Sequence, residues 1–351
     1  MIRFEPLTLT LLIRGALVKP SNIPAQNTQV READLQGFNA IVLENEHLQA
    51  TVLPTLGGKI ASLANRASGR EFLLQPPDRP YSRATYGAPF DQFDTSGFDE
   101  CFPSVSECQY PEAPFSDVLI PDHGELWSVP WHAEQREGKL CLAMSGIRLP
   151  YLFRKELSLR GSTLRIDYEI TSVSDAPMAY LYSAHPLLNV EPGATIVLPS
   201  GIESLYINSS SDDTLGKHGD TCGWPLAKVH GGTTRLDVLV GRELLTAHKL
   251  FTPRVSNGLC GIHFPRTREA LVYRFDPVAL PYIGLWICQG AWPNADTGHF
   301  TVALEPCSGR PDSLVEAISR DEQRVLAPHK THRWWIEVNA LSDCETLTDR
   351  I

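Results

Sequence analysis

The sequence has no segment typical of a nucleic-acid-binding or membrane-spanning protein. Its 351 residues contain no run rich in lysine and arginine, and the formal net charge is -10. A nucleic-acid or anionic-membrane surface needs a basic patch, so this charge argues against both partners. No apolar run reaches the roughly twenty residues that cross a bilayer as a helix. The composition predicts a soluble, acidic protein.

Closely spaced cysteine pairs are also missing. The eight cysteines are scattered over positions 101, 108, 141, 222, 260, 288, 307 and 344. None has the paired spacing of a zinc site or a redox motif, and such spacing in a long chain does not suggest a disulfide framework. We therefore expect reduced thiols, no metal and a cytoplasmic location.

Several catalytic motifs are absent as well. The chain has neither a Gly-x-Ser-x-Gly elbow nor a glycine-rich phosphate loop. His329 and His332 have a three-residue spacing, but they lie in a basic turn without nearby acidic ligands. We predict that both are surface residues.

The N-terminal segment 7–18 is mildly apolar and resembles a signal peptide only in part. Arg14 interrupts it, and no small-x-small cleavage pattern follows before Pro20. We expect a strand there instead, and we expect residues 1–36 to be an N-terminal addition packed on a single domain formed by residues 37–351.

From residue 40 onward, short apolar runs alternate with turn residues at the spacing of an all-β sandwich. The clearest strand covers residues 163–171, where apolar and polar side chains alternate, and turn residues lie on both sides of it. Further strands are predicted at 40–42, 50–53, 60–63, 71–74, 140–144, 152–159, 178–184, 195–198, 236–240, 271–275, 283–288 and 333–338.

Helix signals are few. Asp312 to Glu316 has the pattern of a capping box, which predicts one short helix through about residue 319. The polar, Pro- or Gly-containing stretches 76–94 and 209–223 predict long surface loops, where binding residues tend to lie. The fold class is therefore all-β: a large, mostly antiparallel β-sandwich with one or two short helices.

A carboxylate at residue 305 occupies an unusual position in a predicted strand. In the segment 300–307, Phe300, Val302 and Leu304 share one face. Thr301 and Ala303 lead to Glu305 on the other face, and such small residues leave room for a ligand. The alternative is that Glu305 ends the strand in solvent.

Two histidines have comparable surroundings. In the predicted strand 180–186, His185 shares a face with Ser183 and Leu181, next to small residues, although a structural histidine would fit the same pattern. His123 lies in the turn Pro121-Asp122-His123-Gly124, whose glycine tolerates close approach of a ligand. An ordinary polar turn is an equal alternative.

Acidic and aromatic residues near these positions suit a sugar. Asp99 and Glu100 lie between aromatic residues, where carboxylates accept hydrogen bonds from hydroxyl groups and rings cover C–H faces. A solvated acidic turn is the competing interpretation.

The order and spacing of four motifs resemble the aldose 1-epimerase (galactose mutarotase) family over residues 37–339. The motifs are Val-Leu-Pro-Thr-Leu-Gly-Gly-Lys-Ile at 52–60, Asp-His-Gly-Glu-Leu-Trp at 122–127, Ser-Ala-His-Pro at 183–186 with Val-Glu-Pro-Gly at 190–193, and Val-Ala-Leu-Glu-Pro at 302–306 with Pro-Asp at 311–312.

The resemblance implies a large antiparallel β-sandwich with a long cleft. It also implies interconversion of the α and β anomers of a free aldose without a cofactor. By motif, Glu305 matches the family's general base, His185 its general acid and His123 a histidine that holds the sugar. The family's Asn-Arg pair is not evident, and residues 98–102 occupy that region, so the resemblance does not identify the sugar.

Further candidate contacts to a monosaccharide complete the prediction, and the protein is expected to be a monomer or a homodimer. A non-catalytic sugar-binding protein and a glycoside hydrolase or lyase on the same fold remain alternatives. Trp127, Trp286 and Trp292 are predicted either to stack on the sugar or to have a structural role. Asp122 and Gln289 are predicted to bind sugar hydroxyl groups, and Arg70 and Arg310 are possible anion contacts.

Overall fold

The computed structural model describes residues 28–76 and 79–347. The strand expected within residues 7–18 lies outside them. The first described strand, β1 (Gln29–Leu35), pairs antiparallel with β2 (Phe38–Glu44) and forms an edge of a large sheet. Part of the expected N-terminal addition is therefore an integral strand of that sheet.

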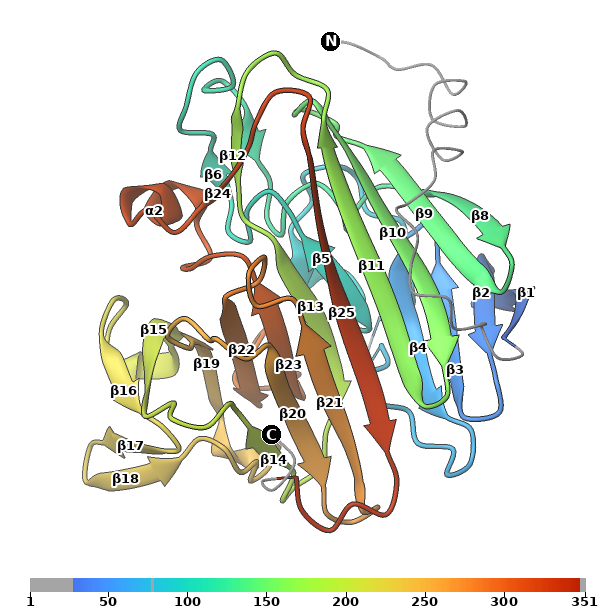
Figure 1. Cartoon of the computed structure of the whole chain (residues 1–351). Helices are drawn as coiled ribbons and strands as arrows, with labels where there is room; N and C mark the ends of the chain where they lie inside the picture. The colour runs from blue at the N-terminus through green and yellow to red at the C-terminus, as the bar shows by residue number, and fades with distance from the viewer. Residues whose placement is uncertain (1–27, 77–78, 348–351) are drawn as a thin grey trace.

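Two large antiparallel sheets dominate the molecule, and in Figure 1 one lies behind the other. The larger one has 11 strands. In spatial order they are β1, β2, β3 (Leu48–Leu53), β4 (Lys59–Asn65), β5 (Phe98–Cys101), β13 (Ser183–Asn189), β23 (Phe300–Cys307), β22 (Tyr282–Gln289), β19 (Thr246–Phe251), β15 (Ser204–Ser210) and β16 (Thr221–Gly223).

The second sheet has 8 strands. Their order is β14 (Thr195–Val197), β20 (Leu259–Phe264), β21 (Glu269–Phe275), β25 (Thr331–Leu341), β11 (Thr163–Ser172), β10 (Tyr151–Arg160), β9 (Lys139–Ser145) and β8 (His132–Arg136). Short pairs join β12 (Met178–Tyr180) to β24 (Arg324–Leu326), β17 (Leu226–Val229) to β18 (Gly232–Arg235), and β6 (Cys108–Gln109) to β7 (Leu119–Ile120). The helical segments are α2 (Leu314–Ser319), η1 (Phe90–Gln92), η2 (Ser211–Asp213) and η3 (Arg242–Leu244).

The core lies between the two sheets and follows the predicted alternation. Leu164 and Ile166 of β11 are completely buried, in one apolar cluster with Val302 and Leu304 of β23. Arg165 of β11 instead forms ion pairs at the surface. Strand β11 belongs to the second sheet and β23 to the larger one, so the two sheets pack face to face around one core. The predicted all-β sandwich is confirmed.

Some predicted elements differ from the structure. The expected strand 178–184 is interrupted at Leu181 and Tyr182, between β12 and β13. Residues 236–240 contribute only an isolated bridge at Val238, and the strands β15, β19 and β20 were not predicted. Residues 209–223 are not one loop, because they include the end of β15, η2 and β16.

The predicted helix exists, but its capping box does not form. Helix α2 begins at Leu314, and the N-cap residue Ser313 makes no side-chain capping bond. The amide of Leu314 donates instead to Oγ of Ser104, 3.1 Å away. A partner distant in the sequence therefore satisfies the helix terminus, which local sequence cannot reveal.

The predicted surface histidines also differ from each other. His329 is exposed, whereas His332 is half-buried and hydrogen-bonds to the Tyr180 hydroxyl group at 2.9 Å. All eight cysteines have free thiols. No helix in residues 28–76 and 79–347 has the length and apolar character needed to cross a membrane.

Candidate active site

Strand register brings the predicted acid and base together. Ser183 of β13 is opposite Cys307 of β23, and Leu187 is opposite Ala303. The residues midway between these pairs, His185 and Glu305, are therefore opposite each other. Opposed residues of neighbouring strands share one face of a sheet and lie close together. The sequence predicted each residue at a similar strand position, and the structure makes them cross-strand neighbours.

This row continues across the sheet in both directions. Asp99 of β5 is opposite His185, and Gly284 of β22 is opposite Glu305. Ala184, which precedes His185 in β13, and Leu304, which precedes Glu305 in β23, belong to the main core cluster on the other face of the sheet. The row therefore lies on the face of the large sheet that points away from the core.

A second row on the same face runs beside the first. Its members are opposed in register and come from β13, β23, β22, β19 and β15. They are Leu187, Ala303, Trp286, Lys249 and Ser209. Ala303, the small residue predicted to leave room for a ligand, thus lies between Leu187 and Trp286, which both line a cavity.

The cavity above these rows has a volume of about 340 Å³. This volume is in the range of small-molecule sites. Loops and the sheet both contribute to its lining, which consists of Phe90, Val105, Ser106, Asp122, His123, His185, Leu187, Asn208, Ser209, Lys249, Trp286, Trp292 and Asp312.

Glu305 is completely buried beside two residues that line this cavity, its cross-strand neighbour His185 and its ion-pair partner Lys249. Its Oε2 accepts hydrogen bonds from Nζ of Lys249 and, at 3.2 Å, from Oγ of Ser183. Its Oε1 has no hydrogen-bond partner among the described residues. Burial raises the pKa of Glu305 above its ordinary value, while the charge of Lys249 lowers it and that of Asp312 raises it further. One carboxylate oxygen is therefore held, and the other is buried without a protein partner.

Lys249 links two carboxylates. Its Nζ lies 3.5 Å from Oδ1 of Asp312, in addition to its bond to Glu305. Burial by itself lowers the pKa of Lys249, but the two acids outweigh that effect and raise it, so the ammonium group stays charged. Asn208 Nδ2 donates to the other oxygen of Asp312 at 3.0 Å, which fixes that carboxylate.

His185 is buried, and its Nδ1 has no hydrogen-bond partner among the described residues. Burial lowers the pKa of His185 well below 6.5, and the nearby His123 and Lys249 lower it further. The ring of Phe90 packs edge-on against it at 5.4 Å between centroids, and that of His123 does so at 5.1 Å. The imidazole is thus neutral in the free protein.

His123 is presented by a tight turn, as predicted. Its φ is +59°, and at the next residue, Gly124, a Cβ would lie 2.0 Å from the carbonyl oxygen of Phe102. Nδ1 of His123 is hydrogen-bonded to Oδ1 of Asp122 at 2.8 Å, and its ring stacks on Phe90 at 4.1 Å. Together these contacts hold the imidazole at the cavity and leave Nε2 for a ligand.

Comparisons with known proteins agree with this architecture. A family model described as a domain of unknown function (DUF5107) matches residues 25–122. No curated protein matches the chain. Among solved structures, a galactose mutarotase related enzyme from Lactobacillus acidophilus is 14% identical, with a TM-score of 0.64 over 87% of this chain and 98% of that one.

Two further structures give the same result. A galactose mutarotase-like protein from Lactobacillus casei is 15% identical, with a TM-score of 0.64 over 86% of this chain and 100% of that one. Another from Clostridium acetobutylicum is 12% identical, with a TM-score of 0.63 over 90% and 99%. The chain has the galactose mutarotase-like fold. At such low identity, the comparisons establish the fold, and the argument about function rests on the site.

On this fold, several of the other predicted residues support the cavity or line it. Trp286 and Trp292 line it and meet edge to face, with 5.9 Å between ring centroids. Asp122 lines it and also accepts the backbone amide of Phe90 at 2.9 Å. Trp127 lies behind the lining, where its Nε1 donates to the carbonyl oxygen of Asp122 at 3.0 Å.

Asp99 and Glu100 point to opposite faces of the sheet. Asp99 is on the row of His185 but is buried outside the cavity lining, 3.1 Å from Nζ of Lys59. Burial raises its pKa to about 6. Glu100 is buried in the core, where Lys155 Nζ lies 2.7 Å away. Alternation along β5 explains why the structure does not bring Glu100 to the site.

The other predicted contacts lie away from the cavity. Gln289 Oε1 accepts the backbone amide of Val240 at 2.8 Å, a structural role. Arg70 lines a different hollow and pairs with Glu191 at 3.4 Å. Arg310 pairs with Glu322 at 3.0 Å. The partners of all three residues lie outside the cavity lining, so the structure does not assign these residues to the candidate site.

The sequence prediction missed Lys249, Asn208 and Phe90. Lys249 lies in β19, between the buried residues His248 and Leu250. A lysine directly before the apolar pair Leu250 and Phe251 was the available signal, because a buried lysine requires charged partners. Among residues 28–76 and 79–347, no group of three or more His, Cys, Asp or Glu side chains could hold a metal ion.

Proposed function

We propose that this protein is an aldose 1-epimerase-like enzyme that interconverts the α and β anomers of a free aldose. The observation that carries the proposal is the cross-strand arrangement of Glu305 with His185, which lines the cavity. The adjoining residue His123 and the tryptophans of the lining supply contacts that a sugar needs. The galactose mutarotase-like fold of the solved neighbours supports it.

The chemistry is a proton exchange across one C–O bond. The unpartnered Oε1 of Glu305 takes the proton from the anomeric hydroxyl group, and a C1 carbonyl forms as the bond from C1 to the ring oxygen breaks. His185 gives a proton to that ring oxygen. Rotation about C1–C2 and reclosure, with both protons returned, produce the other anomer. Each proton transfer contributes a factor of about 10²–10⁴.

The remaining lining holds the sugar in place. His123, oriented by Asp122, donates to or accepts from a sugar oxygen through Nε2. Trp286 and Trp292 cover C–H faces of the ring. Hydroxyl groups that point away from C1 meet polar side chains of the lining such as Asn208, Ser209 and Asp312.

The pKa directions make the pH dependence specific. Catalysis needs an ionised Glu305 and a protonated His185, yet burial raises the pKa of Glu305 and lowers the pKa of His185. The productive protonation state is therefore a minor form of the free protein. The pH profile of kcat/KM is expected to be bell-shaped with a low maximum, because only this minor form is active.

The decisive variant is Glu305→Gln, which keeps the side-chain shape and removes the base. Anomer exchange is measured by NMR exchange spectroscopy on a panel of hexoses and pentoses, and the variant should lose at least 10²-fold in rate. Glu100→Gln is the matched control, because Glu100 is a buried carboxylate with a lysine partner in the same sheet but outside the cavity. Full activity in folded Glu305→Gln would falsify the assignment.

A non-catalytic sugar-binding protein is the second candidate. It is favoured by the ion pair that holds Glu305 to Lys249 and by the neutral state of His185. A binding protein predicts saturable sugar binding without any effect of the wild-type protein on the rate of anomer exchange. The same NMR measurement therefore separates the two candidates.

A further inference from the structure

Asp99 lies in the same strand row as His185 and Glu305, and the proposed reaction gives it no role. Strand register places it directly opposite His185, on the neighbouring strand β5. Opposed residues of antiparallel strands have Cβ atoms about 4.5–5.5 Å apart, so these two side chains are close neighbours. Asp99 is buried and does not line the cavity. Its effect on a bound molecule therefore acts through the residues beside it.

Asp99 and His185 each have a buried polar atom without a partner. Oδ1 of Asp99 and Nδ1 of His185 make no hydrogen bond to any described residue. Such atoms cost free energy when they stay unpaired, and most buried polar atoms in proteins are paired. A carboxylate oxygen accepts hydrogen bonds, and an imidazole nitrogen donates when it carries a proton. A proton on Nδ1 would therefore satisfy both atoms.

Glu305, on the other side of His185, is the competing acceptor for that proton. Its Oε1 is also buried and unpartnered among the described residues. In the proposed reaction this oxygen takes the proton of the anomeric hydroxyl group, so it has to remain free of the imidazole. Asp99 is then the acceptor that remains in the row.

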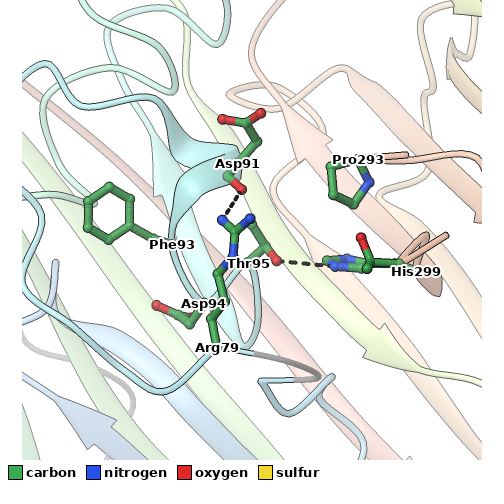
Figure 2. Close-up of a pocket in the computed structure, with 8 residues that line it drawn as sticks. Arg79, Asp91, Phe93, Asp94, Thr95, Pro293 and His299 are labelled. Carbon is green, nitrogen blue, oxygen red and sulfur yellow. Dashed lines mark hydrogen bonds between the residues drawn. The ribbon is translucent and has the colours of Figure 1, made fainter. Parts of the chain in front are cut away.

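Lys59 holds Asp99 from the side away from His185. Its Nζ lies 3.1 Å from Oδ2 of Asp99 and also pairs with Oδ2 of Asp94. Figure 2 shows the carboxylate of Asp94 turned away from the imidazole of His299. Lys59, Asp94 and Asp99 are all buried, and we call them the Lys59 cluster. One ammonium group is shared by two carboxylates, so an ionised Lys59 cluster has an excess of one negative charge.

A cluster of the same composition lies on the other side of His185. There the ammonium group of Lys249 is shared by Glu305 and Asp312. This cluster also has one positive and two negative groups when ionised. Because Asp99 and Glu305 flank His185 in the row, the imidazole lies between the two clusters. Both clusters favour a positive charge on it.

Other surroundings of His185 oppose that charge. Burial lowers the pKa of His185 well below 6.5, and His123 and the two lysines lower it further. His123 itself is hydrogen-bonded to Asp122 at 2.8 Å. Burial raises the pKa of Asp99 to about 6 although Lys59 lowers it, so most Asp99 carboxyl groups are ionised at pH 7. An ionised Asp99 in contact with the imidazole offsets the two lysines.

We infer that Asp99 is a positioning residue for the proposed acid: its Oδ1 accepts a hydrogen bond from Nδ1–H of His185 and stabilises the imidazolium. His185 lines the cavity, and its Nδ1 is the buried, unpartnered nitrogen, so Nε2 is the nitrogen that meets the sugar. In the neutral imidazole the same bond fixes the proton on Nδ1. The inference rests on the proposed function for the role of His185 as an acid.

Nitrogen-15 NMR of the histidine-labelled wild-type protein at pH 7 tests the contact directly. The chemical shifts of Nδ1 and Nε2 report which nitrogen carries the proton, and His185→Asn identifies the signals. We expect the proton on Nδ1 in the wild-type protein and on Nε2 in Asp99→Ala. A neutral wild-type imidazole with its proton on Nε2 would overturn the inference. So would a proton that stays on Nδ1 in folded Asp99→Ala, because Glu305 would then be the acceptor.

A second variant measures the effect on the reaction. Asp99→Asn keeps the side-chain shape and removes the charge, so kcat for anomer exchange should fall about ten-fold. KM should stay unchanged, because Asp99 does not line the cavity. Glu100→Gln, next to it in β5 but paired with Lys155 in the core, is the matched control and should keep wild-type kcat. Equal kcat in the two variants would contradict the inference.

The two measurements separate this inference from the proposed function. A wild-type protein that has the proton on Nδ1 but does not accelerate anomer exchange would contradict the proposed function alone. A wild-type protein that accelerates exchange but has the neutral proton on Nε2 would contradict the role of Asp99 alone.

Discussion

Lys249 and Glu305 form a buried ion pair although their strands, β19 and β23, are separated by β22. The intervening strand permits this contact because Gly284 is its residue opposite Glu305. With no side chain there, the lysine reaches over β22 to the carboxylate. The protonation of the proposed base therefore depends on a residue two strands away.

Lys249→Met should shift the pH–rate profile to higher pH, because the charge of Lys249 lowers the pKa values of both Glu305 and His185. The charge of Lys249 lowers the pKa of Glu305, so removing it lets the pKa rise and leaves less ionised base at a given pH. Loss of one partner of a buried pair also costs about 3–5 kcal/mol of stability. The measurements are kcat/KM for anomer exchange from pH 4 to 9 and urea denaturation.

Lys155→Met is the control for that variant. Lys155 pairs with Glu100 at 2.7 Å in the core, so its loss should destabilise the fold to a similar extent without moving the pH–rate profile. If both variants displaced the profile equally, the effect would come from general loosening of the structure and not from the charge beside Glu305.

Asp312→Asn should have the opposite effect on the profile. The negative charge of Asp312 raises the pKa of Glu305, so its removal should lower that pKa and move the limb of the profile that Glu305 sets to lower pH. An asparagine oxygen can still accept the bond from Asn208 Nδ2. Shifts of Asp312→Asn and Lys249→Met in the same direction would contradict the electrostatic account.

Gly284→Ala should reduce activity by displacing the base. An added Cβ would lie 3.0 Å from Oε2 of Glu305 and 3.2 Å from Cε1 of Phe251. Both neighbours are buried, so the carboxylate has to move, and we expect at least a ten-fold loss in kcat/KM with an overpacking cost of about 1–3 kcal/mol. Steady-state kinetics at saturating and limiting sugar give both parameters.

Gly232→Ala provides the comparison, since an added Cβ at Gly232 has no atom within 4 Å. That variant should keep wild-type kinetics. Unchanged kinetics in folded Gly284→Ala would show that the position of Glu305 tolerates the displacement.

His248→Gln should make stability less sensitive to acid. Burial lowers the pKa of His248 to about 4, from 6.5. Between these values the unfolded chain binds a proton that the folded chain excludes, so stability falls as pH decreases from 6.5 to 4. The contribution at pH 4.5 is roughly 2–3 kcal/mol. Urea denaturation at pH 7 and 4.5 should show a smaller difference in the variant.

The exposed residue His230 is the reference for this measurement. His230→Gln should lose stability between pH 7 and 4.5 to the same extent as the wild-type protein. An identical loss in His248→Gln would mean that the buried imidazole does not carry this pH dependence.

The parts of the site that could be predicted from the sequence are those encoded locally. Alternation along residues 300–307 separated the core face from the face of Glu305, and the two-residue period holds wherever one face is buried. The Pro-Asp-His-Gly turn likewise predicted how His123 is presented. The all-β class followed from the same periodicity.

The parts that could not be predicted depend on pairing between distant strands. Strand β19 contains the buried polar residues His248 and Lys249, so it lacks the apolar pattern of a strand. Its lysine is satisfied by Glu305, which is 56 positions away in the sequence. Asp99 and Glu100 are adjacent in β5, so the alternation of side chains along a strand allows only one of them to face a given site.

The residues of the two strand rows and those of the cavity rim have different structural origins. His185, Glu305 and Lys249 lie on strands inside the large sheet, whereas Phe90, Asp122 and Trp292 come from segments outside those strands. Insertions or deletions in the rim would change which molecule enters without altering the spacing of the proposed acid and base. In evolutionary terms, ligand choice can diverge while the reaction is inherited unchanged.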